Sequence, residues 1–124
     1  MRLSSDYTYA IVGASNDKSK YGNTVLLDLK NFGFNVIPVN PKEEYIENMK
    51  CYESVKDINP RPKMVVTVVP PQVTNKVVME CKEAGIKRVW MQPGSESDTA
   101  IEFCSKNGIE TNSGVCIMLA KNDM

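Results

Sequence analysis

Histidine is absent from this 124-residue chain, and its absence excludes several kinds of chemistry. A nucleophilic cysteine or serine usually needs a histidine as its base, so Cys-His and Ser-His catalysis within one chain are excluded. No C-x-x-C pair occurs either; the four cysteines are Cys51, Cys81, Cys104 and Cys116. With neither histidines nor paired cysteines, we expect no zinc site and assign no metal ligands. Free cysteines of this kind are typical of the reducing cytosol.

Excess charge and long apolar runs are also missing. Fifteen basic residues balance fifteen acidic ones, so the formal net charge is zero. A neutral chain has no global attraction to nucleic acid or to an anionic membrane. No stretch reaches the roughly 18 apolar residues that span a bilayer, and polar residues interrupt the first positions, where a signal peptide would need its apolar core. We therefore expect a cytoplasmic protein that binds neither nucleic acid nor membrane.

Short apolar runs alternate with amphipathic stretches, and this alternation predicts strands followed by helices. Five strands are predicted, at residues 9–12, 35–39, 64–69, 88–91 and 109–111. Helices are predicted at 22–32 and 71–84, with a third one capped by Ser95 and ending near Asn107, and a closing turn at 115–120. The polar region 43–62 is the least regular, and a short edge strand near Cys51–Tyr52 and one helical turn at 54–58 are expected in it. The length predicts one domain, residues 1–124, with a loosely held lead-in at 1–7.

This order of elements predicts an α/β fold, namely a Rossmann-like, doubly wound parallel sheet of five strands with helices on both faces. The second strand is expected on one side of the first, and the strand at 64–69 on the other side. Ligands of such sheets bind outside the carboxyl ends of the strands, at the point where the strand order reverses. The segments expected to meet there are residues 13–22, 40–42, 69–71 and 92–95.

The segment from Tyr9 to Gly22 has the form of a phosphate-binding site, with a strand, a tight turn at Gly13, a loop and a helix that begins at Gly22. Backbone N–H groups at the start of a helix attract anions, and the helix dipole adds to this attraction. The spacing matches neither the dinucleotide fingerprint G-x-G-x-x-G nor the P-loop pattern. A turn that needs its glycines for packing alone is the alternative interpretation.

The side chains of this loop offer further contacts to a ligand. Ser15, Lys18 and Lys20 are candidates for contacts with a phosphate, and Tyr21 is a candidate to lie over the ligand. The alternative is that the lysines are simply solvated and that the tyrosine is an ordinary exposed residue. The loop therefore indicates an anion site without identifying the anion.

Lys42 indicates which kind of nucleotide would bind. It follows Asn40 and Pro41 at the end of the second strand, where an NAD site has an acidic residue for the ribose hydroxyls. A positive charge at this position suits a ribose that bears its own phosphate. NADP and coenzyme A both have such a ribose. Glu43 and Glu44 follow directly and offset part of the charge.

Four motifs at the predicted strand ends together resemble a known family. They are V-G-A-S after the first strand, P-V-N-P after the second, V-V-P after the third and V-W-M-Q-P-G after the fourth. The set extends over residues 7–120 and resembles the CoA-binding domain family. Its members are small stand-alone Rossmann proteins similar to the N-terminal domain of the succinyl-CoA synthetase α subunit. The resemblance implies coenzyme A or an acyl-CoA as the ligand.

The resemblance also implies roles for individual residues. From the phosphates to the thiol, the implied contacts with coenzyme A are Gly13, Ala14 and Ser15, then Lys42, then Val68, Val69 and Pro70, and last Gln92, Gly94 and Cys116. The loop departs from the family at Asn16-Asp17, where a proline often follows G-A-S. The contacts with the pyrophosphate are therefore expected to differ in detail.

No catalytic residues are predicted, because no pair of carboxylates lies at the predicted strand ends. The phosphohistidine of the synthetase belongs to a second domain, which these residues do not include. The predicted function is non-catalytic binding of coenzyme A or an acyl-CoA, in a regulatory role or as a subunit of a larger acyl-CoA system. A homodimer and a partner protein both stay open. The alternatives are an NADP- or NAD-binding redox-sensing domain, and a redox protein in which Cys116 forms a mixed disulfide with coenzyme A.

Overall fold

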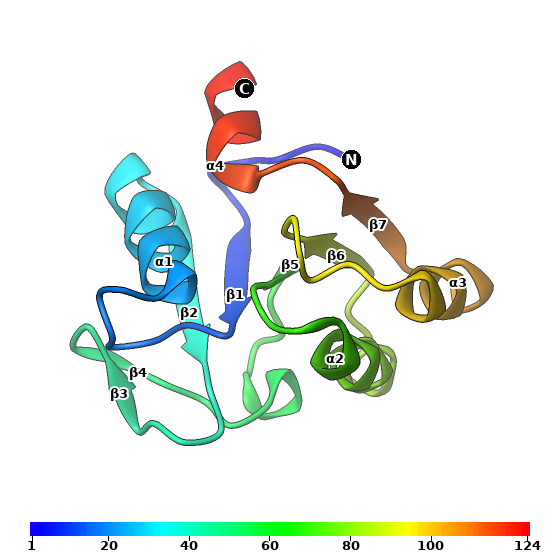
Figure 1. The fold of residues 1–124 in the computed structure, drawn as a ribbon, viewed down its shortest axis with the longest axis horizontal. Coiled ribbons are helices and arrows are strands. Elements are labelled where there is room, and N and C mark those ends of the chain that lie inside the picture. The colour runs from blue at the N-terminus through cyan, green and yellow to red at the C-terminus, as the bar shows by residue number, and fades with distance from the viewer.

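Five parallel strands form the central sheet of the computed structural model, which describes residues 1–124 (Figure 1). Their order is β2-β1-β5-β6-β7, and their bounds are Thr8–Val12 for β1, Asn35–Val39 for β2, Met64–Thr67 for β5, Arg88–Met91 for β6 and Glu110–Ser113 for β7. Every neighbouring pair is parallel. The chain continues from β1 to β2 on one side and to β5 on the other, so the order reverses at β1 and β5 as predicted.

Helices cover both faces of the sheet (Figure 1). Their bounds are Tyr21–Phe32 for α1, Pro71–Ala84 for α2, Asp98–Lys106 for α3 and Ile117–Ala120 for α4. Tyr9 and Ile11 of β1 pack in one core with α1 and α4, while Ala10 and Val12 pack in the other core with α2 and α3. Strands buried on both faces appear in the sequence as continuous apolar runs. The predicted doubly wound five-stranded α/β domain is confirmed.

The start of α3 differs from its prediction. Ser97, and not Ser95, caps this helix, because its hydroxyl accepts a hydrogen bond from the N–H of Ala100 at 3.2 Å. Ser95 is buried, and its hydroxyl oxygen lies 2.8 Å from that of Thr67 at the end of β5. A buried hydroxyl needs a partner, so Ser95 stays bound to the sheet and the helix begins later.

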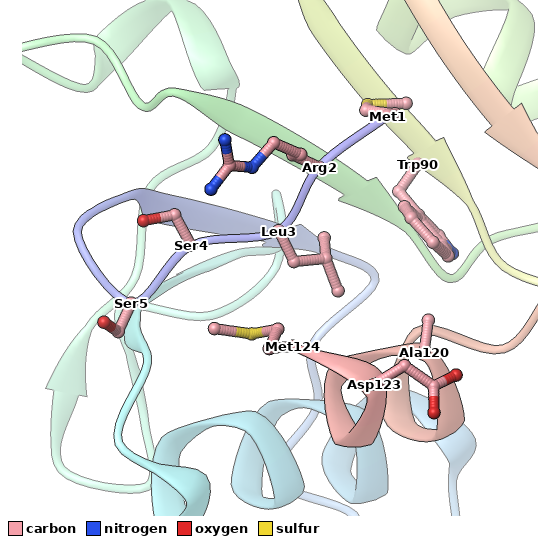
Figure 2. A pocket seen from close by; sticks show the side chains of 9 residues that line it. All are labelled: Met1, Arg2, Leu3, Ser4, Ser5, Trp90, Ala120, Asp123 and Met124. Carbon is pink, nitrogen blue, oxygen red and sulfur yellow. The ribbon is translucent and has the colours of Figure 1, made fainter.

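The lead-in at residues 1–7 makes more contacts than a loosely held segment would. The hydroxyl of Tyr9 donates to the backbone oxygen of Ser4 at 2.8 Å and accepts from its N–H at 2.9 Å. Met1 and Leu3 pack against the core on the α1 side. Figure 2 shows both side chains with Trp90 around a pocket of about 580 Å³, which shares no residue with the predicted site.

The irregular region 43–62 contains a small hairpin that the sequence does not predict. Its strands are β3, Tyr45–Ile46, and β4, Met49–Lys50, and they pair antiparallel. A turn of 3-10 helix follows at Val55–Asp57, within the helical region expected there. Strands of two residues are too short to show a hydrophobic period, so only their tertiary contacts reveal them.

Candidate functional site at the strand carboxyl ends

β1 ends in a glycine turn that packs closely against the segment after β5 and against the start of α1. Gly13 has a φ of +98°, and its N–H donates to the backbone oxygen of Val39 in β2 at 3.0 Å. A side chain at Gly13 would collide with the carbonyl oxygen of Val68, and one at Gly22 would collide with the carbonyl oxygen of Gly13. The end of β1 thus touches both the start of α1 and the segment after β5. Packing alone explains both glycines, whatever the loop binds.

Side-chain amides hold the loop after Gly13 from its inner side. Asn23 donates through Nδ2 to the backbone oxygen of Ser15 at 2.8 Å, and Asn40 donates to that of Ala14 at 2.9 Å. The N–H groups of Ala14, Ser15 and Asn16 have no acceptor in the chain. Successive N–H groups without acceptors, close to the start of a helix, form a favourable environment for an anion.

A pocket of about 340 Å³ lies beside this loop, and we call it the lysine pocket. Its lining includes six predicted site residues, namely Gly13, Lys20, Asn40, Pro41, Lys42 and Val69. The other lining residues, which were not predicted from the sequence, are Val12, Val39, Glu53, Val73, Lys76, Val77 and Glu80. The last four of these share one face of α2, since their spacing is three, one and three. That spacing was the available signal for them.

Positive charge in the lysine pocket is not neutralised by ion pairs. Lys20, Lys42 and Lys76 are exposed, and none of them pairs with a carboxylate. Glu80 instead accepts a hydrogen bond from the Ser54 hydroxyl at 3.0 Å. Lys18, which was predicted with Lys20, lies outside the pocket and pairs with a carboxylate of the β3–β4 hairpin. The lysines of the pocket are thus free to turn toward an anion.

A second pocket, of about 450 Å³, adjoins the first at Val69, and we call it the glutamine pocket. It is lined by Tyr21, Val68, Val69, Pro70, Pro71, Gln92, Pro93, Gly94 and Ser95. The two pockets therefore bring together most of the predicted site residues. The predicted residues that line neither pocket are Ala14, Ser15, Lys18, Gly22 and Cys116.

Cys116 is nevertheless bonded to two lining residues of the glutamine pocket. The Nε2 amide of Gln92 donates to the Tyr21 hydroxyl at 3.0 Å and to Cys116 Sγ at 3.3 Å. The Tyr21 oxygen and Cys116 Sγ are also 3.3 Å apart. Gln92 is fully buried, and its Oε1 accepts from the N–H of Ile117 at 2.7 Å. These bonds fix the glutamine side chain in one orientation.

The same bonds shift the acidity of the thiol. Partial burial by itself raises the pKa of Cys116, but hydrogen bonds from Tyr21, Gln92 and the N–H groups of Met118 and Leu119 outweigh burial and lower this pKa. Burial and the contact with Cys116 raise the pKa of Tyr21. The thiolate at this position is thus stabilised by donors, and no charged side chain is needed.

The structure shows the fold class of this chain, and comparison with known proteins shows its family. The sheet order, with a glycine turn where it reverses, defines a Rossmann-like domain. The chain belongs to the CoA-binding domain family. The model of this family, described as "CoA binding domain", matches residues 7–122. The resemblance seen in the strand-end motifs is therefore confirmed. A solved structure, a conserved hypothetical protein from Pyrococcus furiosus, is 46% identical with a TM-score of 0.88, covering 91% of this chain and 97% of that chain.

The curated relatives are much longer proteins. An ADP-forming acetate–CoA ligase of Methanocaldococcus jannaschii is 41% identical over 78 residues, which are 63% of this chain and 11% of the ligase. The α subunit of an ADP-forming acetate–CoA ligase II from Pyrococcus furiosus is 41% identical over 81 residues, which are 64% of this chain and 18% of the subunit. The chain is therefore homologous to a minor part of each ligase.

The structure contains neither a metal-binding cluster of side chains nor a helix that could span a membrane. No group of three or more cysteine, aspartate or glutamate side chains is arranged to hold a metal ion. None of the helices combines the length and the apolar character needed to cross a membrane.

Proposed function

We propose that this chain binds coenzyme A or an acyl-CoA across the two adjoining pockets, without catalysing a reaction by itself. The observation that carries the proposal is the lysine pocket, where unpaired cations lie beside a loop with N–H groups that lack acceptors. The adenosine and its ribose phosphate would lie in this pocket. The pyrophosphate would accept from the N–H groups of Ala14 to Asn16, and the pantetheine would run past Val69 toward Gln92.

Membership in the CoA-binding domain family supports coenzyme A in general, and the choice between the free coenzyme and a particular acyl-CoA belongs to the proposal. A regulatory role, or a role as one subunit beside a catalytic partner, is also proposed. The relatives named as ligases or ligase subunits support the second role. The chain itself has no histidine, so a partner chain would supply any phosphohistidine chemistry.

Isothermal titration with a panel of nucleotides tests this proposal. We expect coenzyme A and acetyl-CoA to bind in the micromolar range, which corresponds to about −8 kcal/mol. NADP, NAD and ATP are expected to bind more weakly, because none of them can occupy both pockets with a phosphorylated ribose and a thiol arm. Tight binding of NADP, without binding of coenzyme A, would contradict the proposal and favour the redox-sensing alternative.

A second candidate function is thiol–disulfide exchange at Cys116, and the bonds from Tyr21 and Gln92 favour it. In this reaction the Cys116 thiolate attacks one sulfur of coenzyme A disulfide. A Cys116–coenzyme A disulfide forms, and the second coenzyme A leaves as its thiolate. Mass spectrometry of peptides after treatment with coenzyme A disulfide would show the adduct on Cys116. The buried Cys81 and Cys104 serve as internal references, and an unmodified Cys116 would exclude this function.

A further inference from the structure

The β3–β4 hairpin is bonded directly to the loop at residues 13–20, although more than twenty residues separate them in sequence. The side chain of Asn16 donates through Nδ2 to the backbone oxygen of Tyr45 at 2.8 Å. Its Oδ1 accepts from the backbone N–H of Glu47 at 2.9 Å. Both the nitrogen and the oxygen of the Asn16 side-chain amide are thus hydrogen-bonded to the hairpin backbone. A single side chain therefore ties the middle of the loop to the hairpin.

The side chain of Glu47 makes the second connection. Its Oε2 accepts from Lys18 Nζ at 3.0 Å and from Asn23 Nδ2 at 2.7 Å. The bonds from Lys18 and then Asn23 lower the pKa of the Glu47 carboxyl group. The buried side chain of Asn23 also donates to the backbone oxygen of Ser15. The Glu47 carboxylate is therefore linked through the Asn23 amide to the part of the loop whose N–H groups have no acceptor. Glu47 thus contacts the loop directly at Lys18 and is linked through Asn23 to Ser15.

Glutamate is an unusual residue at the turn position that Glu47 occupies. Glu47 has a φ of +50° and Asn48 a φ of +63°, so both central residues of this two-residue hairpin turn are left-handed. Such turns favour glycine, asparagine or aspartate, and glutamate pays a conformational penalty there. An outlier of this kind suggests that the side chain has a task, and the task visible here is the pair of bonds to Lys18 and Asn23.

We infer that Asn16 and Glu47 are positioning residues that hold the loop at residues 13–20 in its anion-binding conformation before a ligand arrives. This inference rests on the proposed function of the loop. Neither residue lines either pocket, so each acts through the loop backbone. A loop that is already ordered loses less conformational entropy on binding, so the ligand binds more tightly.

The substitution Glu47→Gly separates positioning from folding and from charge. Glycine suits the left-handed turn, so the urea midpoint of unfolding is expected to stay the same or to rise. Removing a carboxylate near an anion site would strengthen binding if only charge mattered. Loss of positioning predicts the opposite, a dissociation constant for coenzyme A that is about tenfold higher. Glu47→Gln keeps an acceptor for Asn23 and is expected to restore most of the affinity.

One control variant and one further readout complete the experiment. Glu44→Gln removes a negative charge just before the same hairpin but no bond to the loop, so affinity is expected to stay equal or to rise slightly. Hydrogen exchange of the Asp17, Ser19 and Lys20 amides, which are hydrogen-bonded within the loop, provides a readout in the ligand-free protein without coenzyme A. We expect this exchange to accelerate in Glu47→Gly and in Asn16→Ala, but not in Glu44→Gln.

The outcomes separate the two hypotheses. Unchanged amide exchange in Glu47→Gly, or unchanged or tighter binding of coenzyme A, would overturn the positioning role. If the unsubstituted protein does not bind coenzyme A, the proposed function fails, and the exchange measurement still decides whether the hairpin orders the loop.

Discussion

The lysine pocket and the glutamine pocket adjoin each other, but their polar groups are held in opposite ways. Lys20, Lys42 and Lys76 are exposed and unpaired, so their positions follow whatever anion approaches. Gln92 is fully buried, and both ends of its amide are bonded to neighbours. The lysines attract an anion but impose no single geometry on it. The glutamine amide has one fixed geometry and carries no charge. Under the proposed function, recognition and orientation of the ligand would therefore fall to different ends of the site.

The glycine turn supports both pockets, so altering it should have the largest effect. Gly13→Ala would place a methyl group on the carbonyl oxygen of Val68 at a positive φ. We expect the free energy of unfolding to fall by about 3 kcal/mol in urea titrations. Gly33→Ala is the matched control, because Gly33 also has a positive φ but open space around it, and about 1 kcal/mol is expected there. Equal losses in the two variants would show that packing at Gly13 is not limiting.

Charge recognition can be tested at the lysine pocket. Lys42→Gln or Lys76→Gln should raise the dissociation constant of coenzyme A about tenfold, the value of one charge-assisted hydrogen bond. Dephospho-coenzyme A lacks the ribose phosphate, so its affinity is expected to change little. Titration calorimetry of both ligands measures the difference, and Lys63→Gln, outside both pockets, is the control. Equal losses for the two ligands would mean that these lysines do not contact the ribose phosphate.

A substitution in the glutamine pocket is expected to have the smallest of these effects. The bond from Tyr21 stabilises the Cys116 thiolate, so Tyr21→Phe raises the pKa of the thiol and lowers the thiolate fraction at any pH below this pKa. Alkylation of Cys116 by iodoacetamide should slow about threefold at pH 8, with the rate profile moved to higher pH. Tyr45→Phe is the control.

Cys104 gives an internal reference in the same experiment, because burial raises its pKa to about 11. Its alkylation is expected to stay negligible in every variant. A rate profile at Cys116 that is identical in Tyr21→Phe and in the unsubstituted protein would show that the hydrogen bond does not tune the thiol.

Much of the fold could be predicted because its signals are local. The continuous apolar runs of β1 and β5 indicate strands buried on both faces, and the structure buries every residue from Tyr9 to Val12 and from Met64 to Thr67. Gly33 and Gly85 follow α1 and α2 with positive φ, as helix ends require. Ser95 misled the prediction of α3, because a capping signal does not reveal that a serine is buried against Thr67.

The candidate site was predictable where it follows from strand ends and from the loop that joins β1 to α1. Asn40–Lys42 and Val68–Pro70 line pockets because chain direction in a parallel sheet brings strand carboxyl ends to one edge. Lys76 was missed because its role depends on which way α2 faces. Lys18 was predicted beside Lys20, but its partner Glu47 comes from a hairpin 29 residues away. Sequence spacing contains no information about such a contact.

The sequence by itself determined the order of strands and helices, the glycine turn after β1 and, through its strand-end motifs, the CoA-binding domain family. Each of these depends on neighbouring residues, whose spacing sets backbone geometry and burial. Only the tertiary structure decided which cations stay unpaired, that Gln92 joins Tyr21 to Cys116, and that Glu47 holds the loop. These features depend on groups that are distant in sequence and meet only when the sheet and its helices pack.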